Sequence, residues 1–138
     1  HAVCPAGARL YLGTVPYKAA NLEELAALGV RAVITLNQAW EPQIKGGVGK
    51  ASIEAGMAHL NLPTPDFSAP SQAYIHAAVE FTEQQVAAGV GVYVHCNGGK
   101  GRSAVCVLAY LIRARRISAA EAFDLVRKQR KIARMLER

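Results

Sequence analysis

Residues 92–103 read V-Y-V-H-C-N-G-G-K-G-R-S, which predicts a strand, a glycine-rich loop and the start of a helix. An apolar run, 90–94, leads into Cys96, and an apolar helix-like segment, 104–112, follows Arg102. The N–H groups of such a loop and the positive end of the helix dipole together form a site for an anion such as phosphate. This stretch therefore predicts both the type of fold and an anion site within it.

Outward from this stretch, the chain alternates apolar runs with helical patterns. Further strands are predicted at 9–13, 30–36 and 58–62, and helices at 21–29, 50–55, 71–88 and 101–115, with a last helix from 118 onward. Such alternation predicts an α/β fold with a mostly parallel central sheet flanked by helices. No linker or repeat divides the sequence, so we expect a single domain over 1–138, truncated at its start because it opens at His1 rather than Met.

Polar residues mark the predicted helix starts. Asn21 is predicted as the N-cap of the first helix, and Ser118 with Glu121 has the spacing of a capping box. The buried side of the last helix is predicted to consist of Phe123, Leu125, Val126 and Ile132.

Composition excludes several classes of protein. No apolar run reaches the ~18 residues of a membrane span. The three cysteines have neither disulfide nor zinc spacing, which favours a reducing intracellular compartment, and Cys106 is expected in the core. The net charge of +6 lies in residues 113–138, where nine Lys and Arg stand against three acids. That helix is either a solvated surface or a face for an anionic membrane or substrate, and nucleic acid is disfavoured because no aromatic residues alternate with the charges.

Cys96 is the candidate nucleophile, because the field that holds a phosphate would also ionise a thiol. The alternative is an inert buried cysteine. Arg102 can hold two phosphoryl oxygens with its planar guanidinium, the alternative being a surface charge. The rest of the predicted phosphate-binding loop is Asn97, Gly98, Gly99, Lys100 and Gly101.

Three further side chains complete the expected chemistry. Ser103 is predicted to donate a hydrogen bond to the Cys96 sulfur, or otherwise simply to begin the helix. His95 is expected to orient the loop rather than to transfer protons. Phosphoester cleavage needs a proton donor for the leaving oxygen, and Asp66 is the only carboxylate in the proline-rich loop 63–70. Asp66 is therefore the candidate acid and then base, with a turn-forming aspartate as the alternative.

These residues match a known pattern. H-C-x5-R-S at 95–103 resembles the signature of cysteine-dependent phosphatases related to protein tyrosine phosphatases, and Asp66, about thirty residues upstream, resembles the compact dual-specificity branch. The segments 31–41 (RAVITLNQAWE), 62–70 (LPTPDFSAP) and 92–103 are together similar to the mitochondrial PTP-like phosphatase group, whose known substrate is phosphatidylglycerophosphate. That family continues past its final helix, so we also expect truncation at the C-terminal end.

The resemblance implies a dual-specificity-phosphatase-like fold, a phosphocysteine intermediate at Cys96 and no cofactor or metal. It also implies a location at a mitochondrial or other organelle membrane. The family motif at 37–41 usually carries an acid where this chain has Gln38, so any role of that acid does not transfer. Trp40 and Glu41 are candidate pocket-rim residues, with core packing as the alternative for Trp40.

Several functions stay open at this point. The loop carries one lysine, Lys100, beside the neutral Asn97, which favours a singly phosphorylated anionic phospholipid over a multiply phosphorylated inositide. Dual-specificity protein or phosphoglucan phosphatases are the alternatives of the same chemistry. A non-catalytic phosphate-binding module and a rhodanese-type sulfurtransferase, which does not need Asp66, are alternatives of other classes. We expect a monomer that makes peripheral membrane contact through its basic C-terminal helix.

Overall fold

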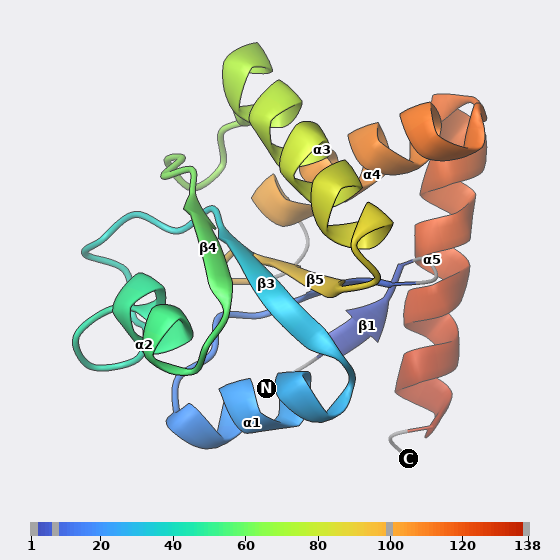
Figure 1. Ribbon diagram of the computed structural model, residues 1–138. Helices are drawn as coiled ribbons and strands as arrows, with labels where there is room; N and C mark the ends of the chain where they lie inside the picture. Colours follow the sequence, from blue (N-terminus) through green and yellow to red (C-terminus); the bar gives the residue numbers. More distant parts are fainter. Residues whose placement is uncertain (1–2, 7–8, 99–100, 137–138) are drawn as a thin grey trace.

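The computed structural model describes residues 3–6, 9–98 and 101–136, with five strands joined in one sheet in the order β1-β2-β5-β3-β4. The strands are β1 (Val3–Pro5), β2 (Leu10–Gly13), β3 (Val30–Thr35), β4 (Ala58–Asn61) and β5 (Gly91–His95). Strands β2, β5, β3 and β4 are parallel, and β1 pairs antiparallel with β2 (Figure 1). The predicted α/β fold with a mostly parallel sheet is confirmed.

Helices cover both faces of this sheet. They are α1 (Ala19–Ala27), α2 (Val48–Glu54), α3 (Gln72–Ala87), α4 (Arg102–Arg115) and α5 (Ala119–Leu136). Side chains along β5 alternate between two cores, as the period of two in a strand requires. Val92 and Val94 pack in the core with α3, α4 and α5, whereas Tyr93 packs in the core with α1 and α2.

The parallel strands end together at one edge of the sheet, which we call the site edge. His95 is in register with Gly13 and Thr35, and Thr35 is in register with Asn61. The segments that leave this edge are 14–18, 36–47, 62–71 and 96–101. Ligand sites of open parallel sheets form at this edge.

Several local predictions are confirmed. The helix predicted over 71–88 is present as α3, and the Ser71 hydroxyl accepts a hydrogen bond from Tyr74 N at its start. The Ser118 hydroxyl accepts from Glu121 N (3.1 Å), and the Glu121 carboxylate accepts from Ser118 N (3.2 Å), which is the predicted capping box. Cys106 is buried, and burial raises its pKa to about 12, so it remains a protonated core thiol.

Other local predictions are wrong. Helix α1 begins two residues before Asn21, whose side chain accepts hydrogen bonds from Tyr17 N and Lys18 N instead of capping as the first residue. Helix α2 begins at Val48 rather than 50. Phe123 is exposed, with the Arg127 guanidinium 5.9 Å from its ring centroid, so it is not part of the core.

Two further points concern the ends of the chain. Strand β1 was not predicted, because three residues carry too little pattern to be read without their partner strand. The side chain of Ile132 lies outside the described residues. No helix in the described part of the chain combines the length and the apolar character needed to cross a membrane.

Candidate active site

The loop after β5 places the predicted nucleophile at the end of the sheet. Cys96 is buried, and its sulfur lies 3.2 Å from the hydroxyl of Ser103, which is also buried. Helix α4 begins at Arg102, so its N-terminus follows the loop directly. The predicted proximity of Cys96 and Ser103 is confirmed, and both side chains lie at the positive end of a helix dipole.

Arg102 is held by a buried ion pair that the sequence did not predict. Its Nη1 donates to Glu41 Oε2 (2.7 Å) and its Nη2 to Glu41 Oε1 (2.8 Å), while Nη1 also donates to the carbonyl of Thr64 (2.8 Å). The hydrogen bond from Arg102 holds the pKa of Glu41 below its usual value, and Glu41 in turn raises the pKa of Arg102. Glu41 is therefore a buried partner of the arginine, and its prediction as a pocket-rim residue is wrong.

This pairing decides which edge of the guanidinium remains available. Glu41 occupies the edge formed by Nη1 and Nη2. The buried Arg102 Nε has no hydrogen-bond partner among the described residues, and Nη2 lies 3.6 Å from Asp66 Oδ1. The edge formed by Nε and Nη2 can therefore bind two oxygens of one ligand.

The predicted nucleophile, arginine and acid line one pocket of about 560 Å³. Its walls come from the loop after β4, the loop after β5 and the first turn of α4. They are formed by Asp66, Phe67, Ser68, Ala69, Cys96, Asn97, Gly98, Gly101, Arg102 and Val105. Gly99 and Lys100, which were predicted to bind phosphate, lie outside the described residues.

The Asp66 loop is fastened to the ends of neighbouring strands. Leu62 N donates to Thr35 O (2.8 Å) and Thr64 N donates to Leu36 O (3.1 Å), which continues the pairing of β4 with β3. Asp66 itself is half exposed, and its Oδ1 accepts a hydrogen bond from Phe67 N (3.0 Å). The carboxylate thus supports a turn and also faces the arginine, so the two roles considered for it are compatible.

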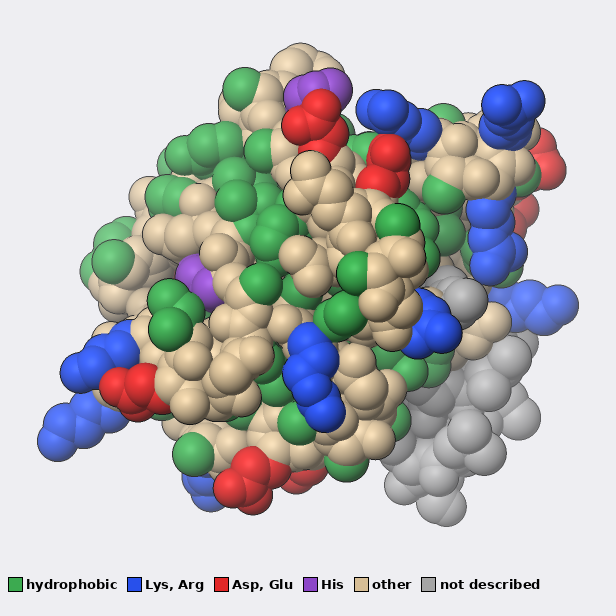
Figure 2. All heavy atoms as spheres, viewed as in Figure 1, with side chains coloured by type: hydrophobic (Ala, Val, Ile, Leu, Met, Phe, Trp, Pro, Cys, Tyr) green, Lys and Arg blue, Asp and Glu red, His purple; other side chains and the backbone are tan. Residues whose placement is uncertain are grey.

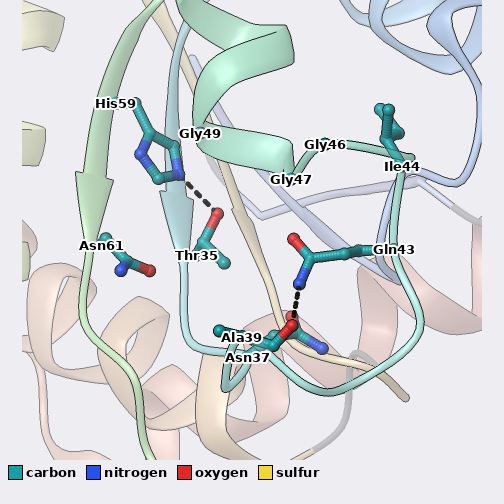
Figure 3. Close-up of a pocket in the computed structure, with 10 residues that line it drawn as sticks. All are labelled: Thr35, Asn37, Ala39, Gln43, Ile44, Gly46, Gly47, Gly49, His59 and Asn61. Carbon is teal, nitrogen blue, oxygen red and sulfur yellow. Dashed lines mark hydrogen bonds between the residues drawn. The ribbon is translucent and has the colours of Figure 1, made fainter.

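Behind the nucleophile, a threonine joins two histidines. Thr35 Oγ1 lies 2.7 Å from Nε2 of His59, as Figure 3 shows. It also lies 2.8 Å from Nε2 of the buried His95. A hydroxyl donates only one proton, so at most one histidine accepts from Thr35 and at least one donates to it. Burial lowers the pKa of His95 to about 3, which keeps the ring neutral. A neutral ring agrees with the predicted role of orienting the loop rather than transferring protons.

A second pocket of about 530 Å³ lies on the other side of this threonine (Figure 3). It is lined by Thr35, Asn37, Ala39, Gln43, Ile44, Gly46, Gly47, Gly49, His59 and Asn61. No charged side chain is among these residues. No role was predicted for His59. Thr35 joins the two histidines because β3 lies between β4 and β5 in the sheet, and no local pattern of the sequence contains that strand order.

Trp40 and Tyr17 complete the surroundings of the loop. Trp40 is 76% exposed, so the alternative of core packing is wrong, and it does not line the pocket of Cys96. The hydroxyl of Tyr17, which was not predicted, donates to Asn97 Oδ1 (3.2 Å). Among the described residues, no three His, Cys, Asp or Glu side chains are grouped as a metal site would require.

Comparisons with known proteins agree with this geometry. Residues 6–116 match the family model described as "Polymorphic toxin system, DSP-PTPase phosphatase". The phosphatidylglycerophosphate phosphatase PTPMT2 of Arabidopsis thaliana is 39% identical over 122 residues, which are 88% of this chain and 52% of that protein. The phosphatidylglycerophosphatase and protein-tyrosine phosphatase 1 of Mus musculus is 37% identical over 120 residues, 86% of this chain and 62% of that protein. The chain thus spans about half to three-fifths of these two relatives.

Solved structures show the same fold. The crystal structure of PTPMT1 in complex with PI(5)P is 34% identical and superposes with a TM-score of 0.80, covering 88% of this chain and 79% of that one. The active form of Tk-PTP is 30% identical with a TM-score of 0.82, covering 93% of this chain and 84% of that one. By sequence and by structure, the chain belongs to the dual-specificity and protein-tyrosine (DSP-PTPase) phosphatase family.

Proposed function

We propose that this chain is a cysteine-dependent phosphomonoester hydrolase whose substrate is a singly phosphorylated anionic phospholipid of the phosphatidylglycerophosphate type. The observation that carries the proposal is one pocket lined by a thiol, an arginine with a free bidentate edge and a half-exposed carboxylate. The relatives named as phosphatidylglycerophosphate phosphatases support the choice of substrate. The PTPMT1 structure with bound PI(5)P supports a lipid phosphate in such a pocket.

The first step forms a phosphocysteine. The Cys96 thiolate attacks phosphorus, the S–P bond forms as the ester P–O bond breaks, and protonated Asp66 donates its proton to the leaving oxygen. Arg102 Nε and Nη2 bind two non-bridging oxygens, and the loop residues Asn97, Gly98 and Gly101, which line the pocket, surround the phosphoryl group. Glu41 keeps the arginine in place during this step.

The second step releases phosphate. Water attacks the phosphocysteine, the Asp66 carboxylate takes a proton from that water, and the S–P bond breaks. The sulfur leaves as a thiolate next to the Ser103 hydroxyl, 3.2 Å away, which stabilises it by a hydrogen bond. The net reaction consumes one ester and one water and yields one alcohol and one phosphate, with Cys96 restored.

The proposal extends to the partners and the location of the chain. We infer a monomer without a nucleic-acid partner, acting at a mitochondrial or other organelle membrane, because a phospholipid substrate resides in a bilayer. Helix α5 supplies a surface for anionic headgroups, since Arg127 and Lys128 are exposed on it. The single-domain organisation of 1–138 is part of the same proposal.

A substrate panel tests the function. We expect kcat/KM to be highest for phosphatidylglycerophosphate when phosphoinositides, phosphotyrosine peptides and phosphoglucan are compared with it. Cys96→Ser should abolish turnover, while Cys106→Ser serves as the matched control because that thiol lies outside the pocket. Retained turnover in Cys96→Ser would refute the mechanism.

The second candidate is a dual-specificity protein phosphatase. Human dual specificity protein phosphatase 1 is 33% identical over 123 residues, which are 31% of that protein. A clear preference for phosphopeptides over every lipid in the panel would establish this alternative and overturn the lipid assignment.

A further inference from the structure

Each of three loops at the site edge carries one exposed aromatic side chain. Tyr17 follows β2 and is 48% exposed, Trp40 follows β3 and is 76% exposed, and Phe67 follows β4 and is fully exposed. Exposed large apolar side chains cost solvation free energy, and a group of them marks an interaction surface. Because all three lie at the same edge of the sheet, they are considered together as one interaction surface.

Each of these aromatic residues is linked to the pocket of Cys96. The Tyr17 hydroxyl donates to Asn97, a pocket residue. Trp40 directly precedes Glu41, the partner of the active-site arginine. Phe67 lines the pocket and follows Asp66. The Tyr17 hydroxyl and the Phe67 ring therefore border the pocket, and Trp40 lies in the neighbouring loop that follows β3 at the same edge of the sheet.

The backbone keeps Phe67 outward. Its φ of 61° is in the left-handed region, which is unfavourable for a bulky residue. The turn is closed by Ser68 N donating to Pro65 O (3.1 Å) and by Phe67 N donating to Asp66 Oδ1 (3.0 Å). A strained, fully exposed phenylalanine beside a reactive carboxylate is best explained by a function of its ring.

The exposed charged side chains of these loops are two lysines and one carboxylate, Asp66. Lys18 and Lys45 are exposed, and neither forms an ion pair with a carboxylate in the described part of the chain. The two acids of the same loops are Glu41, which is buried against Arg102, and Asp66, which faces Arg102. An anionic partner is therefore complementary to this edge.

The other exposed large apolar side chains do not share this setting. Leu28 ends α1, Ile53 lies in α2, and the ring of Phe123 in α5 lies beside the Arg127 guanidinium. Figure 2 shows hydrophobic side chains at the surface over the loops that follow β3 and β4, on the upper left of the view. Aromatic residues and unpaired lysines thus coincide at the site edge.

We propose that Tyr17, Trp40 and Phe67 form an aromatic rim that inserts into the interfacial region of an anionic lipid bilayer, with Lys18 and Lys45 against the headgroups. Aromatic side chains favour this depth of a membrane, and each lysine near an anionic surface strengthens the binding. The pocket then opens directly onto the layer of phosphate headgroups. This inference rests on the proposed lipid-phosphatase function.

Trp40 is the only tryptophan of the chain, so its fluorescence reports on the rim alone. The full chain is titrated with vesicles of phosphatidylcholine and phosphatidylglycerol (3:1) and with vesicles of phosphatidylcholine alone. We expect a blue shift of the Trp40 emission with the anionic vesicles, and quenching by lipids brominated near the headgroup. Binding to the vesicles without any change in Trp40 emission would overturn the rim.

Pelleting with the same vesicles tests a second residue. Phe67→Ala should lower vesicle affinity by about tenfold or more, because the variant loses the burial of an aromatic ring in the bilayer, and a factor of ten corresponds to about 1.4 kcal/mol. Phe123→Ala is the matched control, an exposed phenylalanine outside the site edge, and should bind as the unmodified chain does. Equal losses in both variants would contradict the proposal.

Two further measurements separate this proposal from the proposed function. If the chain hydrolyses a soluble aryl phosphate but its Trp40 emission responds to a phosphopeptide and not to vesicles, the rim is a peptide surface and the bilayer proposal is wrong. If Trp40 enters the bilayer but phosphatidylglycerophosphate is not hydrolysed, the rim stands and the substrate assignment fails.

Discussion

At the scale of single residues, the buried pair of Arg102 and Glu41 has the largest consequences. Its two hydrogen bonds, of 2.7 and 2.8 Å, orient the guanidinium before any ligand arrives. An arginine in the first turn of a helix is repelled by the helix dipole, and the carboxylate offsets that repulsion. The pair therefore serves both the stability of the fold and the readiness of the site.

Glu41→Gln removes the charge and keeps the shape. We expect the free energy of unfolding to fall by roughly 3–5 kcal/mol, because the arginine is left charged, buried and unpaired. We also expect kcat/KM to fall for lipid and aryl phosphates alike, since both need the same arginine. Urea unfolding and kinetics measure the two effects, and Glu24→Gln, an exposed carboxylate in α1, is the control. A variant with wild-type kinetics would show that the pair does not position Arg102.

Asp66→Asn tests the proposed acid. The amide cannot donate its proton as a carboxylic acid does, so kcat should fall by roughly 10²–10⁴ for substrates with a poor leaving group. An activated aryl phosphate, whose leaving oxygen needs little protonation, should lose much less. Equal losses on both kinds of substrate would argue against Asp66 as the proton donor.

The lowered pKa of His95 predicts that the free energy of unfolding falls in acid. Its pKa of about 3 in the folded state lies below the 6.5 of a free histidine, so the unfolded chain binds more protons between these values. This stabilising contribution is complete above pH 6.5 and declines as the pH falls, by about 2 kcal/mol from pH 7.5 to pH 5.

The measurement is urea unfolding at both pH values. His95→Asn should lose most of that pH dependence, whereas His76→Asn, at an exposed histidine, should keep it. Unchanged pH dependence in His95→Asn would mean that other groups cause the acid sensitivity.

Residues close in sequence were predictable and distant partners were not. Cys96, Arg102 and Ser103 lie in one motif, so their proximity follows from the loop itself. Glu41 lies 61 positions from its arginine, and its role depends on the order of β3 and β5 in the sheet. No local pattern in the sequence contains that information.

At the scale of elements, helix α1 was predicted correctly, but its first residue was not. Asn21 was predicted as its N-cap, but its side chain accepts hydrogen bonds from Tyr17 N and Lys18 N, three to four residues back. The helix begins earlier than predicted, with Lys18 as its N-cap, so Asn21 lies at the third helical position and its side chain accepts from the backbone before the helix. The turn it fixes is the one that carries Tyr17 toward Asn97.

Asn21→Ala leaves the two backbone N–H groups without this acceptor. We expect a loss of about 1 kcal/mol in the free energy of unfolding, as for other capping interactions. Urea unfolding of this variant is compared with that of Glu23→Ala, an exposed neighbour in the same helix. If both variants lose the same amount, the loss does not come from the hydrogen bonds of this turn.

Phe123 in α5 and strand β1 were not predicted correctly, because the place of each depends on its tertiary neighbours. The hydrophobic pattern placed Phe123 in the core, yet α5 packs on α4 and β1 with the side that contains Ala122 and Val126. Strand β1 exists because β2 offers a free edge. Such packing choices depend on tertiary neighbours that a linear pattern does not contain.

At the scale of the whole molecule, two regions with exposed positive charge are relevant to an anionic surface, the loops of the site edge and α5. Helix α5 lies along β1 and α4 at the side of the sheet (Figure 1), whereas the three aromatic residues of the proposed rim lie in the loops of the site edge. The alternation of elements predicted a parallel sheet, but the order of its strands, and hence this separation, could not be predicted from the sequence.

The two regions should respond differently to salt. We expect Arg127→Gln with Lys128→Gln to weaken binding to anionic vesicles at low salt and to have little effect at about 0.5 M, where exposed charges are screened within a few ångströms. The loss in Phe67→Ala should persist at high salt, because apolar burial is not screened. Vesicle pelleting at both salt concentrations measures this, and a salt-independent loss in the charge variant would contradict it.

The acceptors around Arg102 also determine when activity can appear as the chain folds. Its guanidinium is held by Glu41 and Thr64, which lie 61 and 38 positions earlier in the sequence. These distant parts of the chain must therefore come together before the arginine is fixed. No early intermediate with local helices alone can meet that condition. Recovery of turnover after dilution from denaturant therefore follows the last cooperative step of folding. The time course of regained activity reports when the native topology is complete.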